Sequence, residues 1–124
     1  MLRMLLYVGL GGFAGTVSRY AISYYTQKWI SSPFPYATFA VNLIGSFLIG
    51  LLFALSARSS IDENTRIILA TGFCGGFTTF SAFSMECVTL LKNGNYGTVL
   101  IYVSASVVLG LAAAYIGMRV VRGG

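Results

Sequence analysis

Four long apolar stretches dominate the chain, separated by three short segments rich in polar residues and turn formers. They cover about residues 4–25, 36–57, 67–91 and 99–118. A helix of roughly 20 apolar residues crosses the hydrocarbon core of a bilayer. Each stretch is therefore predicted to be a transmembrane helix. Four such helices nearly exhaust the length, which predicts an all-α membrane protein with a single integral membrane domain over residues 1–124.

The third stretch has an unusually polar interior. It contains the run Gly-Phe-Cys-Gly-Gly-Phe-Thr-Thr-Phe-Ser-Ala-Phe-Ser over residues 72–84, and Glu86 follows. Adjacent Gly75 and Gly76 give a helix no side-chain support, so we predict that the third helix breaks there, near its middle. A break exposes carbonyl groups on one half and amide N–H groups on the other. In a membrane such backbone is tolerated only where it is buried in protein or lines a wet cavity.

Beyond the double glycine, two sets of side chains recur every three residues, and each set shares roughly one helix face. One set is aromatic and the other carries hydroxyl groups. Both favour contact with a small anion, because ring edges carry positive partial charge and hydroxyls donate hydrogen bonds. The alternative is that the rings pack in the core or against lipid while the hydroxyls bond carbonyls one turn back. The aromatic set is Phe77, Phe80 and Phe83, and the hydroxyl set is Thr78, Ser81 and Ser84.

Two polar side chains lie inside the first and second stretches. Arg19 is an ionisable group within a predicted span, where such a group is costly and faces a cavity or a partner. The alternative is that Arg19 snorkels from a helix end. Asn42 shares one face of the second helix with Thr38 and Ser46. Asn42 either lines an ion path or bonds a neighbouring helix.

Small residues at four-residue intervals predict close helix packing in the first and fourth stretches. Gly11 and Gly15 form such a face in the first stretch. In the fourth, Tyr102 begins the face and is also a candidate hydroxyl donor to an ion, as are the nearby serines. The face of the fourth stretch comprises Tyr102, Ser106, Gly110 and Ala114.

Acidic residues are few. Asp62 and Glu63 lie in the hydrophilic loop before the third stretch, where they favour a helix N-terminus. Glu86 is the only acid inside a predicted span, and its charge is paired, hydrogen-bonded within the bundle, or neutralised. The chain has no histidine, and Cys74 and Cys87 show no metal-ligand spacing. We therefore expect no enzymatic site, because no nucleophile–base pair or metal cluster is available.

Composition supports the membrane assignment. Hydrophobic residues make up 56% of the chain and charged residues only 9%, far from the average of soluble domains. The net charge of +5 does not indicate nucleic-acid binding, because the basic residues are scattered and mostly flank apolar runs. With four spans, the basic residues give one side a mild excess, which the positive-inside rule assigns to the cytoplasm. That side holds Arg3, Arg58, Arg66, Arg119 and Arg122, against Lys28 and Lys92 on the other, plus Arg19 if it counts as flanking.

Three of these motifs together resemble a known family. The run over residues 72–84 is similar to the third-helix signature of the Fluc (CrcB) fluoride channels. Gly-Gly-Phe-Ala-Gly over residues 11–15 with Arg19, and Ala-Val-Asn-Leu-Ile-Gly-Ser over residues 40–46, extend the resemblance over nearly the whole chain. The resemblance implies a four-helix subunit that pairs with a second copy as an antiparallel, dual-topology homodimer. It further implies a multi-pass protein of the cell inner membrane that exports fluoride passively and protects against fluoride toxicity.

The resemblance also implies roles for individual residues. Arg19 would gather fluoride in a vestibule, and Asn42 would donate hydrogen bonds beside the path. A structural Na⁺ ion would be held at the dimer interface by the backbone carbonyls of Gly75 and Thr78. A break in the third helix agrees with this, because freed carbonyls meeting at a two-fold axis suit a hard cation. The other expected pathway residues are Phe80, Ser81, Phe83, Ser84 and Tyr102.

Two other membrane functions compete with a fluoride channel. A proton-coupled exporter of the small multidrug type has a similar length and four spans, but that class needs an acid in its first span, where this chain has Arg19. A purely structural membrane subunit explains the glycines but leaves Arg19 and the aromatic and hydroxyl sets without a role. The expected partners are therefore fluoride, a second copy of the chain and the lipid bilayer, with no nucleic acid.

Overall fold

The protein is all-helical in the computed structural model, which describes residues 1–121. Arg122, which the sequence places with the basic residues of one side, lies outside the described residues. Three helices are continuous, and the region between the second and the last is built from four consecutive helical segments. The continuous helices are α1 (Leu2–Trp29), α2 (Tyr36–Ala57) and α6 (Tyr96–Val121). The segments between them are α3 (Glu63–Arg66), the π-helix η1 (Ile67–Cys74), α4 (Gly75–Phe77) and α5 (Phe80–Lys92).

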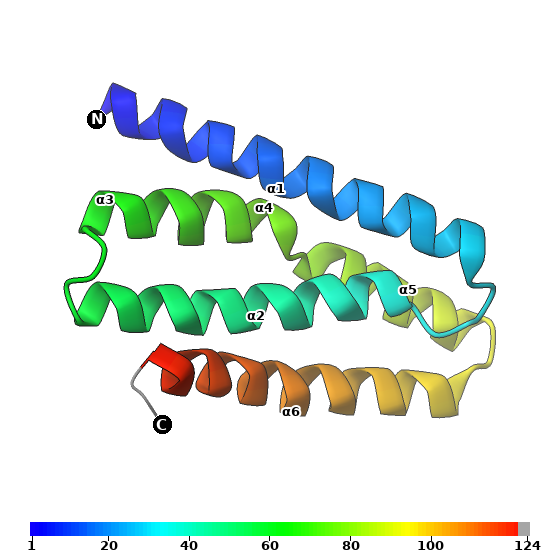
Figure 1. The fold of residues 1–124 in the computed structure, drawn as a ribbon. Helices are drawn as coiled ribbons and strands as arrows, with labels where there is room; N and C mark the ends of the chain where they lie inside the picture. Colours follow the sequence, from blue (N-terminus) through cyan, green and yellow to red (C-terminus); the bar gives the residue numbers. More distant parts are fainter. Residues whose placement is uncertain (122–124) are drawn as a thin grey trace.

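The helices run up and down in one bundle, with α2 lying between the α3–α4 part of the third region and α6, whereas α5 passes behind α2 and contacts α6 (Figure 1). α2 packs mainly along α6, whereas α1 packs along η1 and α4. The N-terminus, the loop between α2 and α3, and the end of α6 lie at the same end of the bundle (Figure 1). Arg58 ties two of these segments together, because its Nη1 atom donates a hydrogen bond to the carbonyl of Val121. Four arginines of the predicted basic side belong to or adjoin these segments, so they lie at one end of the bundle: Arg3, Arg58, Arg66 and Arg119.

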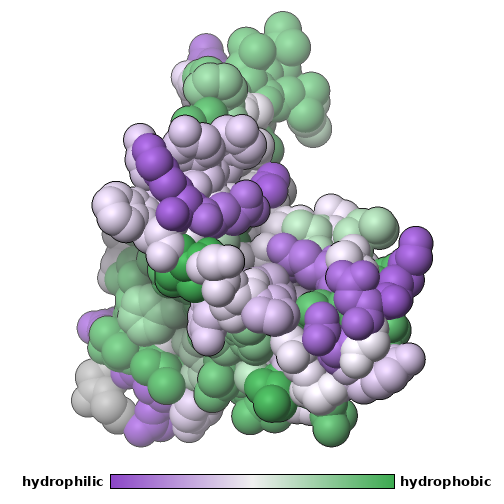
Figure 2. Space-filling model, turned by 90° about the vertical axis from the view of Figure 1, so that its right-hand side faces the viewer, coloured by the Kyte–Doolittle hydropathy of each residue, from purple (hydrophilic) through white to green (hydrophobic). Residues whose placement is uncertain are grey.

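Three helical stretches are long and apolar enough to cross a membrane: α2, the region Glu63–Lys92, and α6. α1 has the length, at 28 residues, but it is less apolar than the other three. Large apolar side chains nevertheless cover the outside of all four, as shown by Phe13 and Leu111, which are 70% and 71% exposed. Figure 2 shows the bundle from the end that carries the α1–α2 and α5–α6 loops. Hydrophilic residues gather on the surface that faces the viewer, while hydrophobic residues cover much of the sides. Three of the four predicted spans therefore have the length and apolarity that a membrane crossing requires, and a span through α1 stays a prediction.

Glycines bring α1 into backbone contact with the third region. A Cβ atom on Gly15 would overlap the carbonyl oxygen of Phe73, and one on Gly76 would overlap the carbonyl oxygen of Gly12. Side chains larger than hydrogen would therefore force α1 away from η1 and α4. This confirms the packing face predicted at Gly11 and Gly15, because close backbone approach is what small-xxx-small patterns permit.

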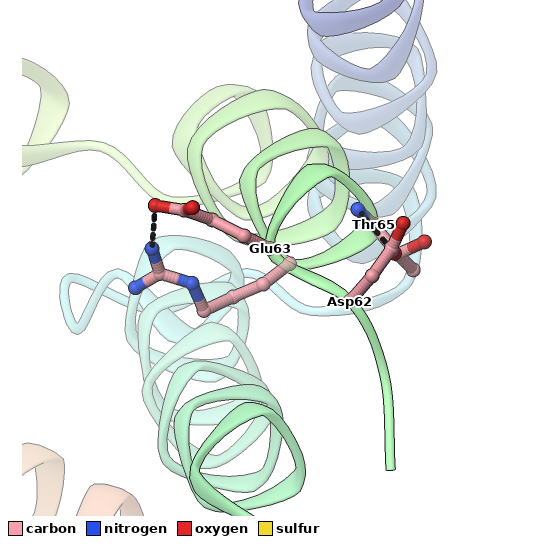
Figure 3. Close-up of polar contacts among 4 residues, drawn as sticks. Asp62, Glu63 and Thr65 are labelled. Atoms are coloured by element: carbon pink, nitrogen blue, oxygen red, sulfur yellow. Dashed lines mark hydrogen bonds and ion pairs between the residues drawn. The ribbon is translucent and has the colours of Figure 1, made fainter. Parts of the chain in front are cut away.

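The third region begins with a capped helix turn. The Oδ1 atom of Asp62 accepts a hydrogen bond from the Thr65 N–H at 3.0 Å, and Glu63 forms an ion pair with Arg66 at 3.7 Å (Figure 3). An N-cap carboxylate satisfies one of the free amides of the first turn and interacts favourably with the helix dipole. The predicted role of the two acids at this helix N-terminus is confirmed.

We expect the Asp62 cap to make stability fall at acidic pH. The hydrogen bonds from Thr65 hold the pKa of Asp62 below its ordinary value of 3.8. Because the folded-state pKa is depressed, the stabilisation is present above about pH 4 and is lost as pH falls through the folded pKa. Asp62→Asn keeps a capping oxygen but does not titrate.

Thermal unfolding in detergent from about pH 6 down to pH 3 tests this cap, since that interval brackets the ordinary carboxyl pKa. The parent should lose more stability on acidification than Asp62→Asn, whereas Asp62→Ala should be less stable at neutral pH. Because the parent and Asp62→Asn differ only at residue 62, the difference between their pH responses isolates Asp62. Identical pH responses of these two proteins would contradict the cap.

Candidate functional site

Extended backbone interrupts the helical path between α4 and α5. Thr78 has φ −91° and ψ 160°, and Thr79 has φ −154° and ψ 119°. The position predicted from the double glycine is wrong, because Gly75 and Gly76 both remain helical in α4. Gly76 instead serves the contact with α1. The extended conformation falls where side chains offer the backbone other partners.

Asn42 supplies those partners from α2. Its Oδ1 atom accepts a hydrogen bond from the Thr79 N–H at 2.9 Å, and its Nδ2 atom donates to the Thr79 carbonyl at 3.2 Å. The Thr79 hydroxyl in turn accepts a bond from the Ala82 N–H at 3.1 Å and so caps α5. Before the interruption, both the N–H and the hydroxyl of Thr78 donate to the Cys74 carbonyl at 2.9 Å.

The helical hydrogen-bond ladder therefore stops at Cys74. In a continuous helix the Thr79 N–H would bond the carbonyl of Gly75, but here it bonds Asn42. The carbonyls of Gly75, Gly76 and Phe77 are thus the free C-terminal carbonyls of the first half, as at any helix end. One of them has a side-chain partner, since Arg19 Nε donates to the Gly76 carbonyl at 3.0 Å.

A groove of about 500 Å³ opens beside the extended residues. α2, the interruption and α6 form its walls, so it lies near the middle of three helical stretches. Phe80, at its border, is 79% exposed. Arg19 lies outside the groove, on α1. The polar residues that line the groove are Asn42, Ser46, Thr78, Thr79 and Ser106.

Aromatic rings continue from the groove into the bundle. The rings of Phe80 and Phe83 lie 5.8 Å apart, and Phe83 lies 4.9 Å from Tyr102. Phe77 does not belong to this row, because it is buried before the interruption and stacks on Phe73 at 5.5 Å. The predicted three-residue repeat is therefore wrong at Phe77, since two extended residues change the direction of the chain.

The hydroxyl repeat is divided in the same way. Thr78 is extended and bonds the Cys74 carbonyl, whereas Ser81 and Ser84 lie on α5. Ser81 is exposed, with its hydroxyl 3.2 Å from that of Thr79. Ser84 is half-buried one turn further along. Of the predicted pathway residues, the structure brings Asn42 and Phe80 to the groove, places Phe83 behind Phe80, and leaves Arg19 on the other side of the interruption.

Glu86 holds two hydroxyl groups inside the bundle. Thr38 donates to its Oε2 atom at 2.6 Å, and Tyr102 donates to Oε1 at 2.7 Å. Tyr102 is fully buried, so its hydroxyl is engaged with Glu86 rather than open to the groove. Glu86 also borders a second hollow of about 160 Å³, together with Ser23, Gln27, Ser32 and Thr38.

Sequence reasoning did not assign this acid–hydroxyl cluster. Its signals were present, because Thr38 lies one turn before Asn42 on the same face of α2, and Glu86 is the only acid within a predicted span. A hydrogen-bonded carboxylate was one of the three states left open for Glu86. The contacts with Thr38 and Tyr102 show that Glu86 is hydrogen-bonded within the bundle.

Side chains offer no metal site in residues 1–121, where no three His, Cys, Asp or Glu residues gather. A cation here would need backbone oxygens. The freed carbonyl of Gly75 and that of extended Thr78 are oxygen donors of the type that hard cations prefer. The Cα of Gly75 faces open space within the subunit, because a Cβ there would meet nothing closer than 4.0 Å. These residues therefore fit a cation held by carbonyls, provided that further oxygens come from outside this chain.

The fold and the site together define a small α-helical, multi-pass membrane protein whose groove between helices combines an apolar lining with a few polar side chains. The family model described as "CrcB-like protein, Camphor Resistance (CrcB)" matches residues 6–118. The chain belongs to this CrcB family.

Curated relatives cover almost the whole chain. A protein of Azobacteroides pseudotrichonymphae is 44% identical over 94% of this chain and 94% of its own length. A protein of Chlorobium chlorochromatii is 45% identical over 92% of this chain and 88% of its own length. A third, of Gloeobacter violaceus, is 44% identical over 94% of both chains. Each of these relatives is named a fluoride-specific ion channel, FluC.

Proposed function

We propose that the chain is the subunit of a fluoride-selective channel that lets fluoride leave the cell passively and so protects against fluoride toxicity. The observation that carries this function is the groove at the interruption, where the amide of Asn42 and the ring of Phe80 lie together among apolar residues in a chain whose relatives are named fluoride-specific channels. Because the curated relatives in this family are named ion channels, the chain is a channel rather than an enzyme.

Fluoride must exchange its water shell for protein groups, because burying a small ion costs on the order of 20 kcal/mol without new partners. A carboxamide has two N–H donors, and Asn42 uses one of them on Thr79. The second is available to an anion in the groove. Hydroxyls of Ser81 and Ser84 and the ring edges of Phe80 and Phe83 continue the donor series along α5. Arg19 and Tyr102 complete the set of residues proposed for the pathway, Arg19 by its charge and Tyr102 by its ring beside Phe83, because its hydroxyl already donates to Glu86.

A proton-coupled drug exporter is the weaker alternative. The relatives are named for fluoride, and α1 contains no acidic residue that could couple transport to protons. Glu86 does not replace such an acid, because its two oxygens already accept hydrogen bonds from Thr38 and Tyr102.

The functional unit is an antiparallel homodimer in the cell inner membrane. Unsatisfied polar backbone cannot face lipid at the middle of a membrane, yet Thr78 and Thr79 line a groove midway along α2 and α6, beside the exposed side chains of Phe80 and Leu111. A second copy covers it and brings an identical interruption to the two-fold axis. Four membrane helices then form each subunit, with α1 as the first and the interrupted Glu63–Lys92 region as a broken third span.

A structural Na⁺ ion at this axis is part of the proposal. Carbonyls of Gly75 and Thr78 from both subunits would hold it, and a cation there offsets the negative ends of two helix halves. Thr78→Ser should be mild, because the ligand is the backbone oxygen and serine keeps a hydroxyl for the Cys74 carbonyl.

Fluoride efflux from proteoliposomes tests the function directly. Vesicles loaded with potassium fluoride should release fluoride when a potassium ionophore removes the charge imbalance, without any proton gradient. Chloride-loaded vesicles and protein-free vesicles are the controls. Release that requires a proton gradient would favour the exporter, and equal release of chloride would contradict fluoride selectivity.

Dual insertion gives a separate prediction about topology. The charge bias between the two ends is mild, so reporter fusions at the C-terminus should show both orientations in cells. Fusions with a cytoplasmic and a periplasmic reporter should each be active in a fraction of the molecules. A single orientation would contradict the antiparallel dimer.

Asn42→Asp should impair fluoride flux more than Asn42→Ser. The acid removes the free N–H donor and adds a negative charge on the path of an anion, whereas serine keeps a hydroxyl donor. Efflux rates from proteoliposomes with equal amounts of the two folded variants measure the difference. If Asn42→Asp conducts like the parent, the free N–H of Asn42 has no part in conduction.

A further inference from the structure

We propose that Arg19 and Asn42 are positioning residues that clamp the extended Thr78–Thr79 segment from two sides. Asn42 holds the backbone of Thr79 from α2, and Arg19 holds the end of α4 from α1. This clamp belongs to the proposed channel site, and only its flux readout rests on the proposed function. Without the clamp, the N–H and carbonyl of Thr79 and the carbonyl of Gly76 would lose the partners that replace the helical ladder.

Asn42 matches the backbone of Thr79 at both of its polar atoms. The N–H of Thr79 bonds Oδ1 at 2.9 Å and its carbonyl bonds Nδ2 at 3.2 Å. A peptide group buried in a membrane protein must be satisfied within the protein. A carboxamide with one acceptor and one donor at this spacing lets Thr79 remain extended at little cost. Asn42 thus stabilises the conformation that frees the carbonyls before it.

Arg19 acts at the opposite side of the interruption. Its Nε atom donates to the Gly76 carbonyl at 3.0 Å, which is one of the carbonyls left free by the end of the ladder. A cation at a helix C-terminus also interacts favourably with the helix dipole. Gly15 lies one turn before Arg19 and allows α1 to touch the backbone at Phe73. The glycine contact therefore brings the guanidinium within reach of the helix end.

This role makes different demands on residue 19 than anion attraction does. Anion attraction requires a positive charge and weakens as salt is added. The clamp requires an N–H donor at the position of Nε. Glutamine places an N–H donor the same number of bonds from Cα as arginine but has no charge. Methionine is unbranched and of comparable length but offers no donor, and lysine keeps the charge with a different donor.

Hydrogen exchange of the amides in residues 74–82 of the full-length protein measures the clamp without any ion flux. Arg19→Met should accelerate this exchange about tenfold, the effect of losing roughly one hydrogen bond, and Arg19→Gln should restore most of the protection. Arg19→Lys should fall between them. Amides in residues 100–115 of α6, which bear no contact with Arg19, serve as the internal control for global opening.

Asn42 gives the second series. Asn42→Leu has a similar shape but neither polar atom, so the exchange of residues 74–82 should again rise about tenfold. Asn42→Asp keeps the acceptor for the Thr79 N–H, so in this variant the exchange of residues 74–82 should rise less. In the flux arm, the Arg19→Gln variant should conduct better than Arg19→Met at every ionic strength.

Two results would overturn the clamp. One is unchanged exchange in residues 74–82 of both Arg19→Met and Asn42→Leu. The other is an order in which charge alone decides both exchange and flux. In that order Arg19→Lys behaves like the parent, Arg19→Gln behaves like Arg19→Met, and added salt removes the difference between these two pairs. If no variant conducts fluoride but the exchange order holds, the clamp stands and the proposed function fails.

Discussion

Phe80→Ile and Phe83→Ile are each expected to reduce or abolish fluoride flux, because isoleucine fills similar space but has no positive ring edge. Both changes remove a ring edge from the row of rings that begins with Phe80 at the groove and continues through Phe83 to Tyr102. Fluoride efflux from proteoliposomes reports the loss. Rates equal to the parent in both variants would end the role of the rings in conduction.

The two variants should differ in stability, which separates conduction from folding. Phe80 is 79% exposed in the subunit, so Phe80→Ile removes little packing. Phe83 packs on Tyr102 with ring centres 4.9 Å apart, so Phe83→Ile should also lower the thermal stability. Phe13→Ile is the matched control, because Phe13 is 70% exposed on α1 and away from the groove. It should leave both flux and stability near the parent values.

The helices themselves were largely predictable from the apolar pattern. The predicted second stretch, 36–57, coincides with α2, and the fourth differs from α6 by about three residues at each end. These elements depend on apolar runs and turn residues that are local in sequence. The π-helical backbone of η1 was not predicted, because no local residue pattern distinguishes it from an α-helix.

The site was predictable in its residue types but not in its contacts. Asn42 and Phe80 both line the groove, yet the interruption lies at Thr78 and Thr79 rather than at the double glycine. The deciding bonds join Asn42 to Thr79, which are 37 positions apart. Arg19 and the Gly76 carbonyl are 57 positions apart. Propensity favoured the glycines, whereas tertiary hydrogen bonds selected the threonines.

Gly75→Leu is expected to abolish the dimer while leaving the subunit folded. Within one subunit a side chain at Gly75 meets open space, and leucine is a better helix former than glycine. In the proposed dimer the same side chain would occupy the two-fold axis, where both interruptions and the Na⁺ ion meet. Light scattering in mild detergent should show the parent as a dimer and Gly75→Leu as a folded monomer.

The neighbouring glycine provides the control. A side chain at Gly76 would overlap the Gly12 carbonyl inside the subunit, so Gly76→Leu should destabilise the subunit itself rather than only its assembly. The unfolding temperature of the parent dimer should also be higher in a sodium salt than in the salt of a bulky organic cation. A ligand that binds only the native state raises the stability of that state. Gly75→Leu should lose this sodium dependence, and Thr78→Ser should keep it. A Gly75→Leu protein that remains dimeric and still responds to sodium would place the cation and the interface elsewhere, because both depend on the same open face of Gly75.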